Sequence, residues 1–147
     1  MNWYEVRVVL ERTIENGQTA KVKEDYLVQA VNVTDAETRI IEELKEVIKG
    51  EFEIDSVKKK KIAEMMEAES GDVWHKVRVS YVTINEKNGE EKKKAETMMV
   101  KAVDVFEAVD TLRKGMKGTM SDWELSSVAE TAIVEAFYIT AEAEEEK

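Results

Sequence analysis

The chain has no cysteine and no proline, and only one of its 147 residues is histidine. Without cysteine there can be no disulfide, no thiolate metal ligand and no thiol nucleophile. No apolar run approaches the ~20 residues that a membrane-spanning helix needs, and the N-terminus lacks a basic segment followed by an apolar one. We therefore expect a cytoplasmic protein with no membrane partner.

The charge of the chain is unevenly placed. Its formal net charge is -10, which argues against nonspecific binding of duplex DNA, because that binding needs a broadly basic surface. Seven of the 22 positively charged residues nevertheless lie in two runs, Lys58–Lys61 and Lys92–Lys94. Residues 141–147 form an acidic tail, which we expect to fray and to compete with nucleic acid for basic groups.

One segment of the chain occurs twice. Residues 3–31 and 74–103 share Trp, Val, Arg, Val, Asn-Gly, Val, Ala and Val in the same order. The offset between the copies is 71 residues before the Asn-Gly pair, 72 after it, and 71 again near residue 123. A long period with two copies predicts one pseudo-symmetric domain over residues 1–140, with halves 1–70 and 71–140.

Alternation of apolar and polar residues predicts the first strands of each half. Residues 3–14 and the return segment 21–31 alternate, and Asn16-Gly17 between them predicts a hairpin turn; Asn88-Gly89 repeats this turn in the second half. The predicted inward residues are Tyr4, Val6, Val8, Leu10, Val22, Tyr26, Val28 and Ala30, then His75, Val77, Val79 and Tyr81.

Capping signals predict one helix in each half. Thr34 and Glu37 have capping-box spacing before a helical apolar pattern, so a helix is predicted from about residue 35 to 49, with Gly50 as its stop. Asp104 and Glu107 repeat the arrangement, and this shorter helix should end in Gly115 or Gly118.

The segment 51–69 is ambiguous, because residues 58–68 have helical propensity. Its repeat partner, 123–140, is rich in β-branched and aromatic residues, which favours a strand in both copies, with a bulge near Asp55-Ser56. Each half then has the order strand, strand, helix, strand. The sequence predicts an α+β fold of six mainly antiparallel strands with two helices packed on them.

Four segments resemble a known family. Trp3-Tyr4, Tyr26–Val28, residues 115–120 and Thr131–Ile133 are similar to a domain of unknown function that recurs in Bacteroidota chromosomes and in crAss-like gut phages. The resemblance covers nearly the whole chain. It implies phage or mobile-element biology in a bacterial host cell, where a role in DNA replication is plausible, and it implies no catalytic chemistry.

Catalysis has little support among the residues. His75 aligns with Tyr4 in the inward phase of a strand, so we expect a packed or hydrogen-bonded core residue. Glu64 and Glu135 occupy equivalent places in the two halves, and we expect solvated strand charges there. No nucleophile-elbow or phosphate-loop pattern occurs, and we predict no enzyme, no catalytic or metal-binding residue and no cofactor.

Two tryptophan and arginine pairs are the candidate binding site. Trp3 with Arg7 and Trp74 with Arg78 fall in the outward phase of equivalent strands. An outward indole beside a guanidinium either stacks on its neighbours, packs against a second sheet or subunit, or binds a ligand with a flat face.

The favoured hypothesis is a non-enzymatic protein that binds single-stranded DNA. Trp3, Arg7, Trp74 and Arg78 would stack on bases, and Lys58, Lys59, Lys60 and Lys61 would contact phosphates. One alternative is a structural or protein-interaction module in which a homodimer covers the tryptophans. Another is a protein that sequesters a small molecule or nucleotide. Neither the strand order nor the oligomeric state follows from the sequence.

Overall fold

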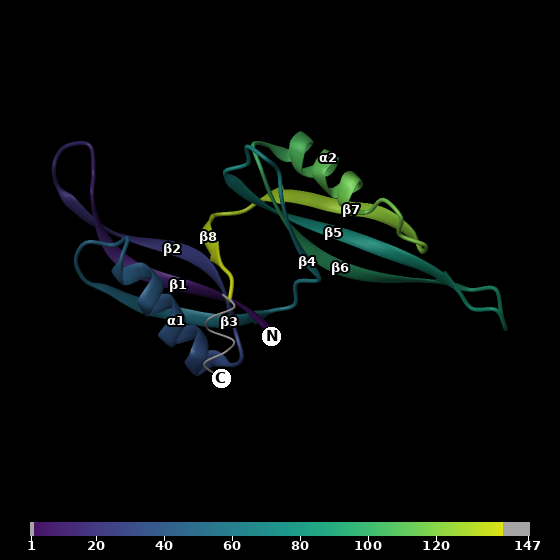
Figure 1. The fold of residues 1–147 in the computed structure, drawn as a ribbon, viewed down its shortest axis with the longest axis horizontal. Coiled ribbons are helices and arrows are strands. Elements are labelled where there is room, and N and C mark those ends of the chain that lie inside the picture. The colour runs from purple at the N-terminus through teal and green to yellow at the C-terminus, as the bar shows by residue number, and fades with distance from the viewer. Residues whose placement is uncertain (1, 140–147) are drawn as a thin grey trace. The chain divides into compact units, whose positions relative to one another are not determined.

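A computed structural model describes residues 2–139 of the chain (Figure 1). The described residues contain two four-stranded sheets and two helices. The elements are β1 (Asn2–Thr13), β2 (Thr19–Ala30), α1 (Val33–Lys45), β3 (Phe52–Lys60), β4 (Glu64–Glu67), β5 (Val73–Ile84), β6 (Glu91–Ala102), α2 (Val105–Gly115), β7 (Asp122–Glu130) and β8 (Ile133–Phe137).

The predicted α+β class is confirmed, but the predicted number of strands is wrong. Sheet A has the order β3-β1-β2-β8, and sheet B has the order β4-β6-β5-β7. The segment 51–69 is two strands instead of one, interrupted at residues 61–63, and the segment 123–140 is interrupted at residues 131–132. Each half of the sequence therefore has the order strand, strand, helix, strand, strand.

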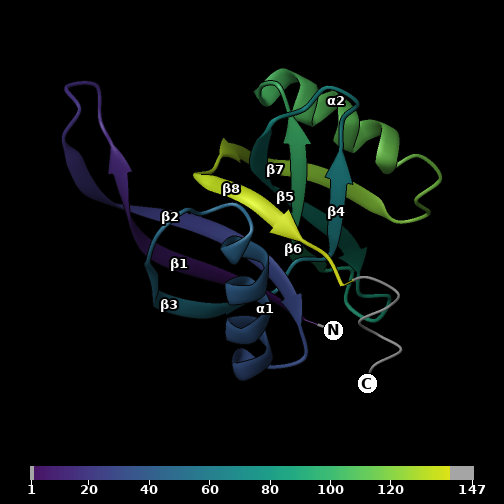
Figure 2. The ribbon, with the colours of Figure 1, turned by 60° about the vertical axis from the view of Figure 1, so that its left-hand side comes forward.

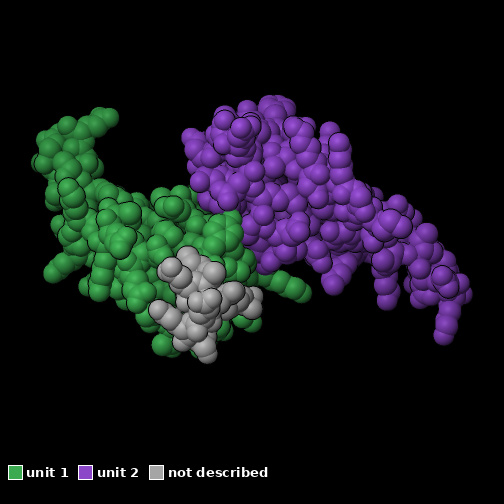
Figure 3. All heavy atoms as spheres, in the orientation of Figure 1, with its two compact units in different colours: residues 1–61, 132–147 green, residues 62–131 purple. Residues whose placement is uncertain are grey.

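The fourth strand of each half lies in the sheet that the other half builds. β4 pairs in parallel with β6, and β8 pairs in parallel with β2, while the other pairs are antiparallel. The chain consequently divides into two compact units (Figure 3). Of the described residues, unit 1 contains 2–61 and 132–139, and unit 2 contains 62–131. The repeat boundary at residues 70 and 71 is thus not the boundary of the units.

The hairpins and bulges follow the predicted local chemistry. Gly17 and Gly89 have φ angles of 81° and 71°, which glycine adopts without steric cost in the turns between β1 and β2 and between β5 and β6. The connection 85–90 is one residue longer than the connection 14–18, which accounts for the change of offset from 71 to 72. A register shift opposite Arg7 and Val8 confirms the bulge predicted at Asp55-Ser56.

Each unit has its own apolar core between one face of its sheet and its helix. In unit 1, α1 crosses sheet A and buries Ala36, Ile40 and Leu44 against the predicted inward residues of β1 and β2 (Figure 2). In unit 2, α2 buries Ala108 and Leu112 against residues that include Val77, Val79, Met98 and Val100. The alternation of the strands therefore identified the helix-covered faces correctly.

The N-cap of the first helix is Asn32, two residues before the predicted cap. The Asn32 side chain accepts a 2.8 Å hydrogen bond from the Asp35 amide, and the Asp35 carboxylate accepts a 3.0 Å bond from the Val31 amide. The capping box is therefore Asn32–Asp35, and the predicted Thr34–Glu37 box is wrong. The second box is Asp104–Glu107, as predicted, and α2 ends at Gly115. The helix α1 ends at Lys45, earlier than predicted.

No helix among the described residues is both long enough and apolar enough to cross a membrane. The acidic tail, 141–147, lies outside the described residues.

Candidate nucleic-acid interface

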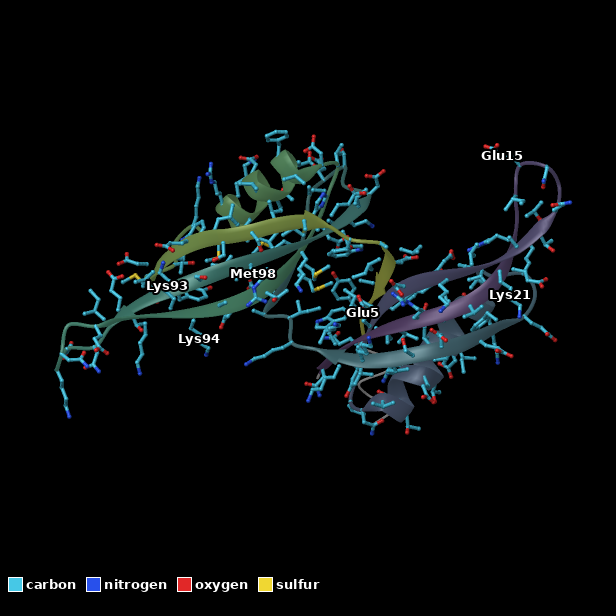
Figure 4. The ribbon with its side chains drawn as sticks, turned by 180° about the vertical axis from the view of Figure 1, so that it is seen from behind. Glu5, Glu15, Lys21, Lys93, Lys94 and Met98 are labelled. Carbon is cyan, nitrogen blue, oxygen red and sulfur yellow. The ribbon has the colours of Figure 1, made fainter. Side chains whose placement is uncertain are left out.

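The candidate residues lie on the face of each sheet that points away from the helix of the same unit, which we call the far face. Neighbours in a ladder share a face, so the far face of sheet A carries Trp3, Arg7 and their partners on β2 and β3. The far face of sheet B carries Trp74, Arg78 and their partners on β6 and β7. Figure 4 labels Glu5 and Lys93, which lie on the far faces of sheets A and B, and Met98, which lies on the helix-covered face of sheet B.

Both tryptophans are buried, and the predicted exposed stacking platform is wrong in this respect. Trp3 is 8% exposed, and Tyr138 meets its ring edge to face at a centroid distance of 5.2 Å. Trp74 is 1% exposed, and the Lys101 ammonium lies 5.9 Å from its ring centroid. Neither indole presents a free flat face. Burial of a large apolar ring lowers the free energy of the folded protein, which favours this arrangement.

The Trp74 indole is held without a hydrogen bond. Its buried Nε1–H has no acceptor among residues 2–139. A buried donor without an acceptor costs about 1–3 kcal/mol, so the burial of the large ring must outweigh this penalty.

Arg7 is exposed but neutralised. Its Nε donates to Asp25 Oδ1 at 2.8 Å, and its Nη2 donates to Asp25 Oδ2 at 3.3 Å. This two-pronged hydrogen bond, followed by the charge of Asp25, raises the pKa of the Arg7 guanidinium. An anion could reach Arg7 only in competition with a carboxylate that is already in place.

Arg78, the repeat equivalent of Arg7, has no such partner. Its Nη1 donates to the Thr97 hydroxyl at 3.3 Å, and Ser127 is its neighbour on β7. Lys76 is exposed two residues away on the same face. No carboxylate of the described chain forms an ion pair with Arg78 or Lys76. The two cations are separated by roughly 7 Å along β5, from the rise of a strand.

The lysine run lies at the edge of sheet A. Lys58 and Lys60 are on the far face of β3, opposite Glu5 and Trp3, and Lys59 is on the other face. All four lysines are exposed, and Lys60 approaches Glu5 at 3.8 Å. Lysines on an edge strand also discourage pairing with a strand of another molecule, which gives this run a structural reason besides anion binding.

The remaining candidates behave as core or surface residues. His75 is 1% exposed, and its Nδ1 lies 3.3 Å from the Val100 carbonyl oxygen, which confirms the predicted core position. Glu64 and Glu135 are exposed. Among residues 2–139, no three histidine or carboxylate side chains gather as a metal would require.

A depression of about 580 Å³ lies in unit 1, between the β1–β2 hairpin and the connection from α1 to β3. Its lining includes Glu11, Lys21, Lys49, Glu51 and Phe52. The charges have both signs and surround little apolar surface. This arrangement lacks the apolar walls with few convergent polar groups that are typical of small-molecule sites.

Lys76, Thr97 and Ser127 are the residues that sequence reasoning missed. The repeat contains a signal for two of them, because an offset of 71 aligns Lys76 with Glu5, and an offset of 72 aligns Thr97 with Asp25, whereas Ser127 aligns with Ser56. A carboxylate in one half is replaced by a cation or a hydroxyl in the other.

A comparison with known protein families covers almost the whole chain. A family model for a domain of unknown function, DUF4494, matches residues 2–139. The protein belongs to the DUF4494 family. No curated protein matches this DUF4494 chain. Membership therefore agrees with the predicted resemblance to a domain of unknown function and assigns no chemistry to the far faces.

Proposed function

We propose that the protein binds single-stranded DNA without catalysing a reaction, and that sheet B contacts its phosphates. The observation that carries the proposal is the pair of exposed cations, Lys76 and Arg78, on a sheet face where no described carboxylate neutralises them. Their separation of roughly 7 Å is on the scale of neighbouring phosphates in an extended nucleic-acid backbone. The hydroxyls of Thr97 and Ser127 can add hydrogen bonds to phosphate oxygens.

The proposed binding through phosphates differs from the base stacking that the sequence predicts. Because Trp3 and Trp74 are buried, binding would rest on phosphate contacts, with the exposed lysines 58, 59 and 61 as additional cations. Such binding depends steeply on salt, because each phosphate contact releases condensed counterions. A net charge of -10 restricts contact to local patches, which a flexible single strand can follow more easily than a duplex.

The test is fluorescence anisotropy of a labelled oligothymidylate between 50 and 300 mM salt. For single strands, log K falls with log salt by about 0.7 per phosphate contact, so one contact is worth roughly eightfold at 50 mM salt. The double variant Lys76→Gln/Arg78→Gln should bind up to about 60-fold more weakly, and the salt slope should fall by about 1.4.

Arg7→Gln is the matched control, because it removes the equivalent guanidinium from a site that Asp25 neutralises. It should leave both the affinity and the salt slope nearly unchanged. Absence of binding by the unaltered protein at 50 mM salt would refute the proposal, as would equal losses in the control and the double variant.

A protein-interaction role is the second candidate, and it rests on α2. Phe106 is 84% exposed, and Val105, which precedes it in the chain, is 37% exposed, whereas the equivalent of Phe106 in α1 is the polar Thr34. An exposed ring of this size next to other apolar groups is typical of a docking surface. Light scattering of the protein across a dilution series would detect a homodimer, and Phe106→Ser should abolish it. A constant monomer mass would contradict a homodimer.

A further inference from the structure

Equivalent positions on the two far faces carry different charges. The offsets of the repeat align Glu5 with Lys76, Asp25 with Thr97 and Asp55 with Ser126, while Arg7 and Arg78 are the same residue type. Three carboxylates of sheet A are thus replaced in sheet B by one lysine and two hydroxyls. The backbone around them is equivalent, because both arginines pair with matching strands and both third strands have the bulge at the same place.

On sheet A, each of the three carboxylates engages a cation. Asp25 binds Arg7 with two hydrogen bonds, Glu5 lies 3.8 Å from the Lys60 ammonium, and Asp55 lies 3.7 Å from the Lys23 ammonium. A phosphate approaching this face would find these cations already paired and would have to displace Asp25 from Arg7. The carboxylate is tethered next to the guanidinium, so it competes at a high effective concentration.

On sheet B, the same geometry leaves Arg78 between two hydroxyl-bearing residues. Thr97 lies opposite it on β6 and accepts one hydrogen bond, and Ser127 lies opposite it on β7. A hydroxyl can turn and donate to a phosphate oxygen, which a carboxylate cannot do. The Ser126 hydroxyl bonds to the Ser80 hydroxyl, so the position of Asp55 is occupied here by a neutral group.

We propose that the far face of sheet B is a phosphate-binding site and that Asp25 and Glu5 are the groups that prevent the far face of sheet A from being a second one. The proposal rests on the proposed function only where the phosphate belongs to DNA. It predicts that the repeat contains one active and one silenced copy of the same site, and that exchanging single residues between the copies converts one into the other.

The experiment follows the side-chain Nε–H signals of Arg7 and Arg78 by ¹H–¹⁵N NMR while pyrophosphate is added to the full chain. The Arg78 signal should move along a saturating curve, and the Arg7 signal should not. In Glu5→Lys/Asp25→Thr, which copies the residues of sheet B, the Arg7 signal should begin to move. In Thr97→Asp, the Arg78 signal should stop moving, and Ser127→Asp gives a second route to the same result. Backbone amide spectra report folding for every variant.

A matched control gives the same change of net charge away from the far faces. Glu42→Lys/Glu86→Gln alters two exposed positions, and in this variant pyrophosphate should not move the Arg7 signal. Equal movement of Arg7 and Arg78 in the unaltered protein would overturn the proposal, and so would an unresponsive Arg78 or an unresponsive Arg7 in the converted variant.

The same variants separate this proposal from single-stranded DNA binding. With oligothymidylate at 50 mM salt, the converted variant should bind roughly eightfold more tightly for each phosphate contact that it gains. If pyrophosphate moves the Arg78 signal but the oligonucleotide does not bind, the phosphate site stands and DNA is the wrong ligand.

Discussion

The exchange of β4 and β8 can be tested with one side chain in each strand. Phe137 in β8 and Met66 in β4 are repeat equivalents at an offset of 71. Phe137 packs against the core of unit 1 and stacks on Tyr26 at a centroid distance of 6.0 Å. Met66 packs against the core of unit 2. If each half of the sequence folded on itself, these contacts would lie in the opposite units.

The expected costs follow from burial. Replacing a fully buried Phe with Ala costs about 3–5 kcal/mol, and replacing a buried Met costs about 2–5 kcal/mol. Both side chains are half-buried. We therefore expect Phe137→Ala to lower the free energy of unfolding by about 2–3 kcal/mol, and Met66→Ala by about 1–2 kcal/mol.

Native-state hydrogen exchange measured by mass spectrometry locates each loss. Phe137→Ala should reduce protection in peptides from residues 2–60, and Met66→Ala should reduce it in peptides from residues 73–131. Val134→Ala is the matched control, because Val134 lies in the same strand as Phe137 and is 50% exposed. It should stay within about 0.5 kcal/mol of the unaltered protein. Loss of protection for Phe137→Ala in residues 73–131, with residues 2–60 unchanged, would refute the strand exchange.

Two further predictions concern the capping box and a buried tyrosine. Asn32→Ala should lower the free energy of unfolding by about 1 kcal/mol, because it removes the acceptor of the Asp35 amide. Thr34→Ala should have little effect. If thermal melts showed the larger loss for Thr34→Ala, the cap would lie at Thr34. Burial, followed by the neighbouring Glu24 carboxylate, raises the pKa of Tyr26 to about 12. The neutral phenol is therefore favoured by folding, so its stabilisation is complete below pH ~10 and is lost as the pH rises through about 12. Between pH ~10 and about 12, urea titrations should show that the free energy of unfolding falls by about 1 kcal/mol more in the unaltered protein than in Tyr26→Phe, after allowance for solvent screening. Equal losses in the two proteins would contradict the raised pKa of Tyr26.

Several local features could be read from residue order because their causes are local. Asn-Gly pairs favour the backbone angles of the two hairpin turns, and alternation along β1 and β5 marks which side chains face the helices. The capping box of α1 could also have been predicted from the sequence. Asn32–Asp35 is the repeat equivalent of Asp104–Glu107 at an offset of 72, whereas Thr34–Glu37 satisfies the same spacing without matching the second copy.

The candidate site was only partly predictable. Arg78 is exposed as expected, but Trp3 and Trp74 are buried. Alternation specifies the side of the strand on which a residue lies, and it carries no information about what covers that side. The difference between Arg7 and Arg78 likewise depends on cross-strand neighbours, because Asp25 and Thr97 reach the arginines through the sheet and not along the chain.

By itself, the sequence determined the repeat, the helix-covered faces, the hairpins, the bulge at Asp55-Ser56 and the α+β class, because each depends on residue types at short spacing or on comparison of two copies. Only the tertiary structure decided that β4 and β8 join the sheets of the opposite halves. A strand of four or five residues offers the same backbone hydrogen bonds to either sheet edge, so the choice depends on which edge the folded chain can reach.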